Sequence, residues 1–132
     1  MDIRRVTEDI AVSPQIHPEE IAAVQAAGFA SIVCNRPDGE SPDQPNWAEV
    51  EAAARAAGLQ CAAVPVSGGG MTQAHVDAMR QAMDTLPKPV LAYCRSGTRS
   101  VTLWALSQRH HIERDTLIAA ARNAGYDLSG IP

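Results

Sequence analysis

The chain is poor in aromatic side chains and in cysteine. Aromatic residues make up 4% of the 132 residues and hydrophobic residues 45%, so the core must consist mainly of alanine, valine, isoleucine and leucine. The three cysteines, Cys34, Cys61 and Cys94, are odd in number and lie far apart without the spacing of metal ligands. Neither a disulfide framework nor a zinc site is therefore indicated, and we expect free thiols and no metal.

The chain also lacks a long apolar run and an excess of positive charge. No segment approaches the roughly 18 consecutive apolar residues of a membrane span, and residues 1–5 lack the apolar core of a secretion signal. We therefore expect a cytoplasmic protein that makes no membrane contact. The net charge of -4 at pH 7 argues against nucleic acid as the main partner.

What is present is an alternation of short apolar runs and helical patterns. With 132 residues the chain has the length of one domain, which we expect to span residues 1–132. A β-prone start at 3–6 and 10–12 precedes helices at 18–26, 47–57, 72–86, 98–109 and 113–124 and buried strands at 30–34, 59–66 and 90–93. This alternation predicts an α/β fold in three layers, with a mainly parallel sheet covered by helices on both faces.

Loops 35–40, 67–70 and 94–99 follow the three buried strands. Because parallel sheets bind ligands outside the carboxyl ends of their strands, we expect these loops to meet. The first two loops offer a candidate pocket rim, made of Asn35, Arg36, Ser67, Gly68 and Gly69. For Asn35 and Arg36, a plain strand-ending turn is an equally good interpretation.

The third loop has the pattern of a reactive-cysteine site. The apolar residues 90–93 run into Cys94, and a short polar loop closed by Arg99 precedes a helix. A strand-to-helix turn aims backbone N–H groups and the positive end of the helix dipole at one point, where Cys94 would lie. Positive charge from Arg95 and Arg99 favours a thiolate at neutral pH. We therefore predict that Cys94 and Arg99 are catalytic.

The remaining loop residues are predicted to bind an anion. Gly97 suits a turn that needs a positive φ or an unobstructed backbone. Thr98 or Ser100 could donate a hydroxyl hydrogen bond. The predicted anion-binding residues are Arg95, Ser96, Gly97, Thr98 and Ser100. The alternative is that Cys94 is a buried cysteine at a strand end and that the arginines are solvated turn residues.

Four other side chains are of a type that can take part in catalysis. Cys34 lies beside the predicted rim and could accept sulfur from Cys94, but a cysteine within a strand is more often simply buried. His75 follows the glycine triplet, and His110 and His111 end a helix. For these histidines we expect structural roles.

Two family resemblances rest on these residues. The string 94–100, Cys-Arg-Ser-Gly-Thr-Arg-Ser, resembles the active-site loop of single-domain rhodaneses, sulfurtransferases in which a loop cysteine carries a persulfide. The opening strand, the helix ending at Gly28, the strand into Asn35-Arg36 and the Val-Pro-Val-Ser-Gly-Gly segment 64–69 are similar to the dual-specificity branch of the tyrosine-phosphatase fold. As a whole the chain resembles the bacterial phosphatase-like domains of β-lactamase hydrolase-like proteins, members of which are fused to persulfide dioxygenases. The resemblance implies a tyrosine/dual-specificity-phosphatase-like fold and a persulfide dioxygenase as a candidate partner.

The chain departs from the phosphatase pattern at two places. Phosphatases of this fold have His before the cysteine and five residues between cysteine and arginine, whereas here Tyr93 precedes Cys94 and four residues separate it from Arg99. The place of their general-acid aspartate is taken by Ser67, and the loss of a general acid removes about 10²–10⁴-fold in rate. Sulfur transfer needs no such acid, because thiolates leave unaided.

These departures favour sulfur transfer over phosphoryl transfer. We expect a sulfurtransferase in which Cys94 takes sulfane sulfur from a small sulfur-containing or anionic substrate, holds it as a persulfide and passes it to a thiol. The alternative is a phosphatase that acts on a phosphoprotein or a small phosphoester through Cys94 and Arg99. A third hypothesis is a non-catalytic module that binds an anion or senses oxidation. None of the three implies a cofactor.

Overall fold

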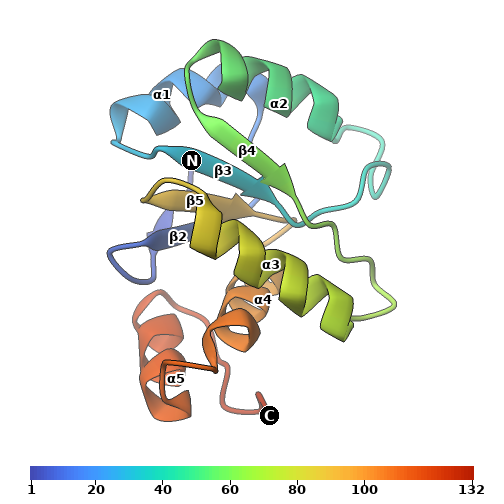
Figure 1. The fold of residues 1–132 in the computed structure, drawn as a ribbon. Coiled ribbons are helices and arrows are strands. Elements are labelled where there is room, and N and C mark those ends of the chain that lie inside the picture. Colours follow the sequence, from blue (N-terminus) through green and yellow to red (C-terminus); the bar gives the residue numbers. More distant parts are fainter.

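One mixed sheet forms the centre of the molecule. The computed structural model describes residues 1–132, and its strands lie in the order β1-β2-β5-β3-β4. The strands are β1 (Arg4–Arg5), β2 (Ile10–Ser13), β3 (Ser31–Cys34), β4 (Gln60–Ala63) and β5 (Val90–Tyr93). Only β1 runs antiparallel to its neighbour, and the other strand pairs are parallel. Strand β5 therefore lies in the middle of the sheet, between β2 and β3 (Figure 1).

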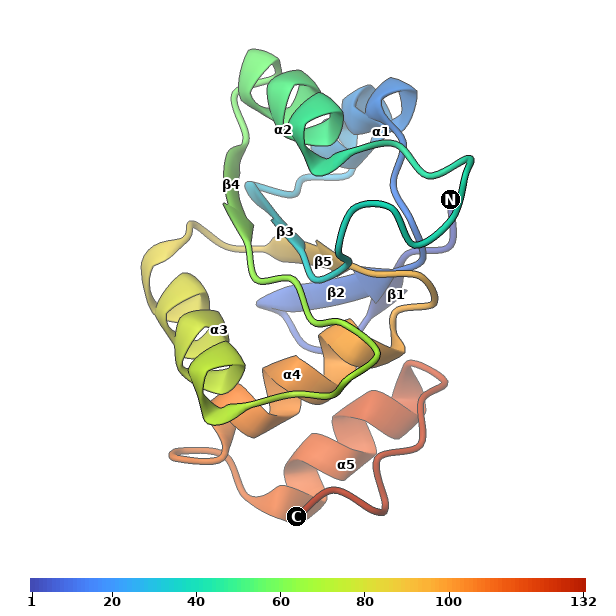
Figure 2. The ribbon, with the colours of Figure 1, turned by 90° about the vertical axis from the view of Figure 1, so that its right-hand side faces the viewer.

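Helices cover both faces of this sheet. On one face lie the short helix η1 (Pro18–Glu20), α1 (Ile21–Ala26) and α2 (Trp47–Ala56), and on the other lie α3 (Gln73–Thr85), α4 (Thr98–Gln108) and α5 (Arg114–Asn123) (Figure 2). The predicted three-layer α/β fold is thereby confirmed. None of the helices combines the length and the apolar character that crossing a membrane requires.

The sheet has a hydrophobic core on each of its two faces, because side chains alternate along the central strand. Val90 and Ala92 of β5 belong to the core beneath α3, α4 and α5, whereas Leu91 and Tyr93 belong to the core beneath α1 and α2. Successive side chains of a strand point to opposite faces, so a strand buried on both sides reads as a continuous apolar run. This is why the sequence predicted β5 with its correct bounds.

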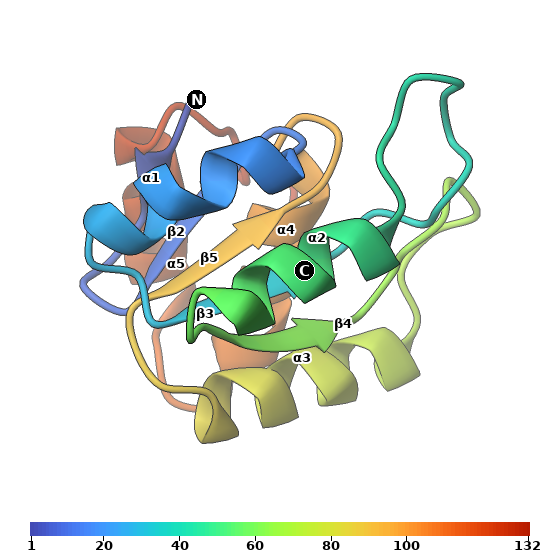
Figure 3. The ribbon, with the colours of Figure 1, turned by 90° about the horizontal axis from the view of Figure 1, so that it is seen from above.

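Strand β4 is shorter and more exposed than the buried strand predicted at 59–66. The ladder ends at Ala63, and residues 60–63 are exposed or half-buried because β4 is the edge strand. Val64 and Val66 are buried outside the ladder, and their N–H groups donate to the carbonyls of Cys34 and Asn35 at 2.9 and 3.0 Å. The segment after β4 is thereby held against the segment after β3. Both lie at the end of the sheet where the carboxyl end of β5 also lies (Figure 3).

The first turn of α3 explains His75. The N–H of Thr72 donates to Nδ1 of His75 at 3.0 Å, and the N–H of His75 donates to Oγ1 of Thr72 at 3.4 Å. This reciprocal cap satisfies N–H groups that a helix start leaves without partners. The structural role expected for His75 is thus that of a helix cap.

Candidate active site

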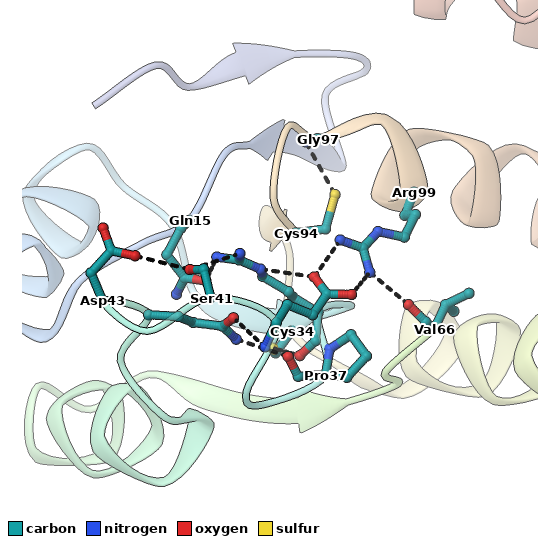
Figure 4. Close-up of polar contacts among 12 residues, drawn as sticks. Gln15, Cys34, Pro37, Ser41, Asp43, Val66, Cys94, Gly97 and Arg99 are labelled. Atoms are coloured by element: carbon teal, nitrogen blue, oxygen red, sulfur yellow. Dashed lines mark hydrogen bonds and ion pairs between the residues drawn. The ribbon is translucent and has the colours of Figure 1, made fainter. Parts of the chain in front are cut away.

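Arg99 joins the three loops that follow β3, β4 and β5. It lies in the first turn of α4, and its guanidinium donates from Nη1 to Oε2 of Glu40 at 2.8 Å and from Nη2 to Oε1 of Glu40 at 2.8 Å. Nη1 also donates to the carbonyl of Val66 at 2.7 Å (Figure 4). The expected meeting of the three loops at the carboxyl ends of the strands is therefore confirmed.

Cys94 lies directly after β5, at the start of the loop that Arg99 closes. The residue is fully buried, and its Sγ accepts a hydrogen bond from the N–H of Gly97 at 3.1 Å (Figure 4). The sequence predicted that several amides from Ser96 to Ser100 would surround the sulfur. In the structure only the Gly97 amide bonds to it, and the N–H of Thr98 donates instead to Oγ of Ser96 at 3.3 Å.

Gly97 needs its lack of a side chain for two reasons. Its φ of 93° lies in the left-handed region, which is one of the two reasons for a glycine here that the sequence offered. A Cβ built there would also meet the side chain of Tyr126, whose hydroxyl donates to the carbonyl of Ser96 at 3.0 Å. Tyr126, from the segment after α5, therefore covers the Cys94 loop. No local pattern in the sequence indicates this contact.

The contacts of Arg99 leave one edge of its guanidinium free. Both hydrogens of Nη1 are engaged, by Glu40 and by Val66, and Nη2 uses one hydrogen on Glu40. The Nε–H and the second Nη2 hydrogen donate no hydrogen bond within the chain. These two form the side-on fork that a phosphate or carboxylate accepts in bidentate fashion. The arginine is thus held from one edge and open at the other.

Glu40 is the residue that sequence reasoning missed. It ends the loop 35–40, which the sequence predicts to meet the other two loops, but no sequence pattern assigns it a role. Arg99 and Arg36 lower the pKa of Glu40 to about 2, and the carboxylate in turn raises the pKa of Arg99. Nε of Arg36 donates to Oε1 of Glu40 at 3.0 Å, so one carboxylate joins two guanidinium groups. The acidic residue on a convergent loop was the signal that could have found it.

The predicted rim residues divide into three kinds. Asn35 is not at a rim, because its side chain is fully buried and its Nδ2 donates to the carbonyl of Val64 at 3.0 Å. Arg36 is buried but lines a polar cavity beside the site. The exposed residues Ser67, Gly68 and Gly69 follow Val66, the carbonyl partner of Arg99.

The other predicted loop residues differ in their contacts. Arg95 is exposed and makes no hydrogen bond within the chain. Ser96 donates from Oγ to Oγ1 of Thr98 at 3.0 Å. Ser100 is fully buried in the first turn of α4, and its hydroxyl has no partner. The Ser100 hydroxyl is therefore free to donate the predicted hydrogen bond to a group bound at the loop.

The other two cysteines are unsuited to serve as nucleophiles. The Sγ of Cys34 donates to the carbonyl of Arg36 at 3.2 Å, and burial raises the pKa of the Cys34 thiol. Burial likewise raises the pKa of half-buried Cys61. A raised pKa keeps a thiol protonated and unreactive at neutral pH. No cluster of His, Cys, Asp and Glu side chains is placed to hold a metal ion.

The fold and this loop together define a phosphatase-like domain. A mainly parallel sheet carries a cysteine at the end of its central strand and an arginine in the following helix, with the open arginine edge beside the loop. The chain belongs to the family described as "Beta-lactamase hydrolase-like protein, phosphatase-like domain", whose profile matches residues 2–111. The predicted family is thereby confirmed.

Three known proteins illustrate the similarity. The Beta-lactamase hydrolase-like protein of Xylella fastidiosa is 39% identical over 130 residues, which are 97% of this chain and 30% of that protein, so the chain spans under a third of its length. A crystal structure of a phosphatase candidate from Neisseria meningitidis is similar with a TM-score of 0.85 and 32% identity, over 98% of this chain and 93% of that one. The structure of Tk-PTP in its active form, at 20% identity, shares the fold with a TM-score of 0.66 over 94% of this chain and 85% of that chain.

Proposed function

We propose that the domain is a cysteine-dependent phosphatase in which Cys94 attacks the phosphorus of a phosphate monoester while Arg99 holds the phosphoryl oxygens. The observation that carries the proposal is the free side-on edge of Arg99 beside the Cys94 loop, on a phosphatase-like fold. A bidentate guanidinium held in place before the reaction stabilises the charge that develops on a transferring phosphoryl group. Phosphate hydrolysis therefore ranks above sulfur transfer, the reaction that the sequence alone favours.

The reaction takes two steps at the same sulfur. In the first, the Cys94 thiolate forms a sulfur–phosphorus bond, the bond to the leaving oxygen breaks, and that oxygen keeps the electron pair. In the second, water attacks the phosphocysteine, inorganic phosphate leaves and the thiolate returns. Arg99 binds the equatorial oxygens in both steps, and the N–H of Gly97, already on Sγ at 3.1 Å, stabilises the thiolate.

The residue at position 67 restricts the substrate. Ser67 cannot protonate a leaving alkoxide as a carboxylic acid would, and Glu40 is ionised while it is paired with Arg99 and Arg36. The leaving oxygen must therefore take its proton from water. We infer that esters with good leaving groups, such as aryl phosphates, react faster than alkyl phosphates.

Sulfur transfer is kept as a second candidate for one specific reason. The Cys94 loop has four residues between cysteine and arginine, and a terminal sulfur needs fewer donors than three phosphoryl oxygens. In that reaction the Cys94 thiolate attacks a sulfane donor, the sulfur–sulfur bond of the donor breaks, and a thiol later takes the sulfur from the Cys94 persulfide. A persulfide dioxygenase as partner stays a prediction that belongs to this candidate.

Intact-mass measurement after a rapid acid quench separates the candidates. The protein is mixed with para-nitrophenyl phosphate in one arm and with thiosulfate in the other, and Cys94→Ser is the matched control. We expect a phosphoryl adduct and steady phosphate release in the first arm, both absent from the control. A persulfide with transfer to a thiol, without phosphate release, would assign sulfur transfer. Neither adduct nor turnover would leave the non-catalytic anion-binding hypothesis.

A further inference from the structure

A polar cavity of about 280 Å³ lies beside the Cys94 loop. Seven side chains line it, and none of them is hydrophobic. Those that carry or can carry charge are Arg36, Arg95, His17 and Asp43. The cavity is thus lined by two guanidinium groups, an imidazole and one carboxylate.

The cavity adjoins the site at two points. Arg95 directly follows Cys94 in the chain. Nε of Arg36 and Nη2 of Arg99 donate to the same oxygen, Oε1 of Glu40, at 3.0 and 2.8 Å. A single carboxylate therefore separates the arginine proposed for catalysis from the cationic cavity.

The cations of the cavity have hydrogen-bond donors to spare. Arg36 is held by Glu40 and, from Nη1, by Oε1 of Gln15 at 3.0 Å, while its Nη2 makes a longer contact of 3.4 Å to Ser41. One hydrogen on each Nη nitrogen is left unused. Arg95 makes no hydrogen bond or ion pair within the chain. Two guanidinium groups with free N–H groups therefore line the cavity, one held by its neighbours and one exposed and unpaired.

The opposing charge in the cavity is weak. Asp43 is exposed to water and accepts a hydrogen bond from Oγ of Ser41 at 2.9 Å. Water screens an exposed carboxylate, so Asp43 subtracts little from the field of the arginines. Glu40 also pairs with Arg36, but it shares its single negative charge between Arg36 and Arg99, so the three groups together remain positive. The absence of hydrophobic lining also disfavours an aromatic ring or an acyl chain.

We propose that this cavity is a second anion subsite, which binds the second phosphate of a small bisphosphorylated substrate while the first lies at Cys94 and Arg99. The inference rests on the proposed phosphatase function and deepens it by naming the substrate class. Each charge-assisted hydrogen bond to the second phosphate favours binding by about tenfold or more. The domain then prefers small bisphosphates to the corresponding monophosphates.

The test compares propyl phosphate with alkanediol bisphosphates of increasing chain length. The measured quantity is the ratio of kcat/KM for each bisphosphate to that for propyl phosphate, in the wild type and in Arg95→Gln. Arg80→Gln is the matched control, since it removes the same charge at an exposed position of α3 that does not line the cavity. We expect a ratio of about ten or more in the wild type and in the control, and a ratio of about two in Arg95→Gln, which is the statistical factor for two equivalent phosphates.

A binding measurement keeps the subsite distinguishable from the catalytic proposal. Calorimetry with propylphosphonate and with the corresponding bisphosphonates is performed on Cys94→Ser and on Cys94→Ser with Arg95→Gln. Tighter bisphosphonate binding that Arg95→Gln removes, together with no turnover of any phosphate ester by the wild type, would overturn the function and support the subsite. Turnover of monophosphate and bisphosphate at the same kcat/KM per phosphate group, with equal phosphonate affinities per phosphonate group, would overturn the subsite alone.

Discussion

The Arg99 guanidinium and the Glu40 carboxylate form a two-point ion pair across the gap between α4 and the loop after β3, with both nitrogen–oxygen distances at 2.8 Å. Both side chains are partly buried, at 22% and 24% exposure. A bidentate pair fixes the plane of a guanidinium as well as its position. Arg99 is therefore oriented before any substrate arrives, and the orientation depends on a residue 59 positions away in the sequence.

Removing the charge of Glu40 tests whether it positions Arg99. We expect Glu40→Gln to lower kcat/KM for an aryl phosphate by about tenfold, because the guanidinium loses its fixed plane, and Glu40→Asp to restore part of the loss. Glu51→Gln, which breaks an exposed ion pair with Arg55 on α2, is the control and should leave kcat/KM unchanged. A rise in kcat/KM for Glu40→Gln would show instead that Glu40 competes with the substrate for Arg99.

The same residue predicts a pH dependence of stability. The pKa of Glu40 is lowered from 4.5 to about 2, chiefly by its hydrogen bonds with Arg99, so its stabilising contribution is present above pH 4.5 and is lost as the pH falls towards 2. The difference in unfolding free energy between the wild type and Glu40→Gln should shrink over that range. Urea unfolding at a series of pH values measures it, and a difference that stays constant with pH would contradict the assignment.

The two arginines of the loop should differ in their tolerance of lysine. Lysine keeps the charge and loses the planar fork. Arg99→Lys should lower kcat/KM for an aryl phosphate by about 10²–10³-fold. Arg95→Lys should lower it by less than about tenfold, since Arg95 is exposed and unpaired. Steady-state kinetics decides this, and similar losses in both variants would show that the open edge of Arg99 is not the binding fork.

Gly97 and Gly28 share a positive φ, but only Gly97 lies against another side chain. Alanine substitutions at the two positions therefore distinguish backbone strain from a steric clash with Tyr126. Gly97 and Gly28 have φ of 93° and 96°, but a Cβ at Gly28 would meet no atom within 4 Å, whereas one at Gly97 would lie 3.0 Å from Cζ of Tyr126 and closer still to its hydroxyl. We expect Gly28→Ala to cost about 1 kcal/mol, and Gly97→Ala at least about 1 kcal/mol more because Tyr126 must move. Urea unfolding measures both, and equal losses would mean that Tyr126 does not pack on the loop.

Restoring a carboxylic acid at position 67 tests the mechanism through the leaving group. Ser67→Asp should raise the hydrolysis of alkyl phosphates by about tenfold or more, and that of aryl phosphates by less, because only the poorer leaving group needs a proton donor. Ser67→Asn has the same shape without the acid and serves as the control. An equal effect of both variants on both esters would remove the general-acid explanation.

The sequence predicted the parts of the molecule that local patterns determine. The bounds of β5, the start of α4 at Thr98 and the positive φ of Gly97 all follow from apolar runs and turn chemistry near the residue itself. Glu40 and Tyr126 could not be found in this way, because each meets the Cys94 loop through a contact between distant positions. The place of Asn35 on a convergent loop suggested a rim position, but its side chain is buried and its Nδ2 donates to the carbonyl of Val64, so the alternative of a strand-ending turn fits it better.

The point at which β4 ends could not be predicted from the sequence for a related reason. The apolar run 59–66 marks residues that avoid water, and Val64 and Val66 do so by packing outside the ladder. Hydrophobicity records burial and does not record which hydrogen-bond partner a backbone group finds. An edge strand and its continuation therefore look alike until the neighbouring strand is known.

The contact between Tyr126 and Ser96 means that the family profile and the unit that folds do not end at the same residue. The family profile ends at residue 111, yet Leu117, Ile118 and Leu128 pack in the core beneath α4, and Tyr126 bonds to the Cys94 loop. A chain cut at residue 111 would expose that apolar surface and release the loop from its cover. A shortened protein that lost activity would then report on folding and loop order, and its inactivity would say nothing about the chemistry of Cys94.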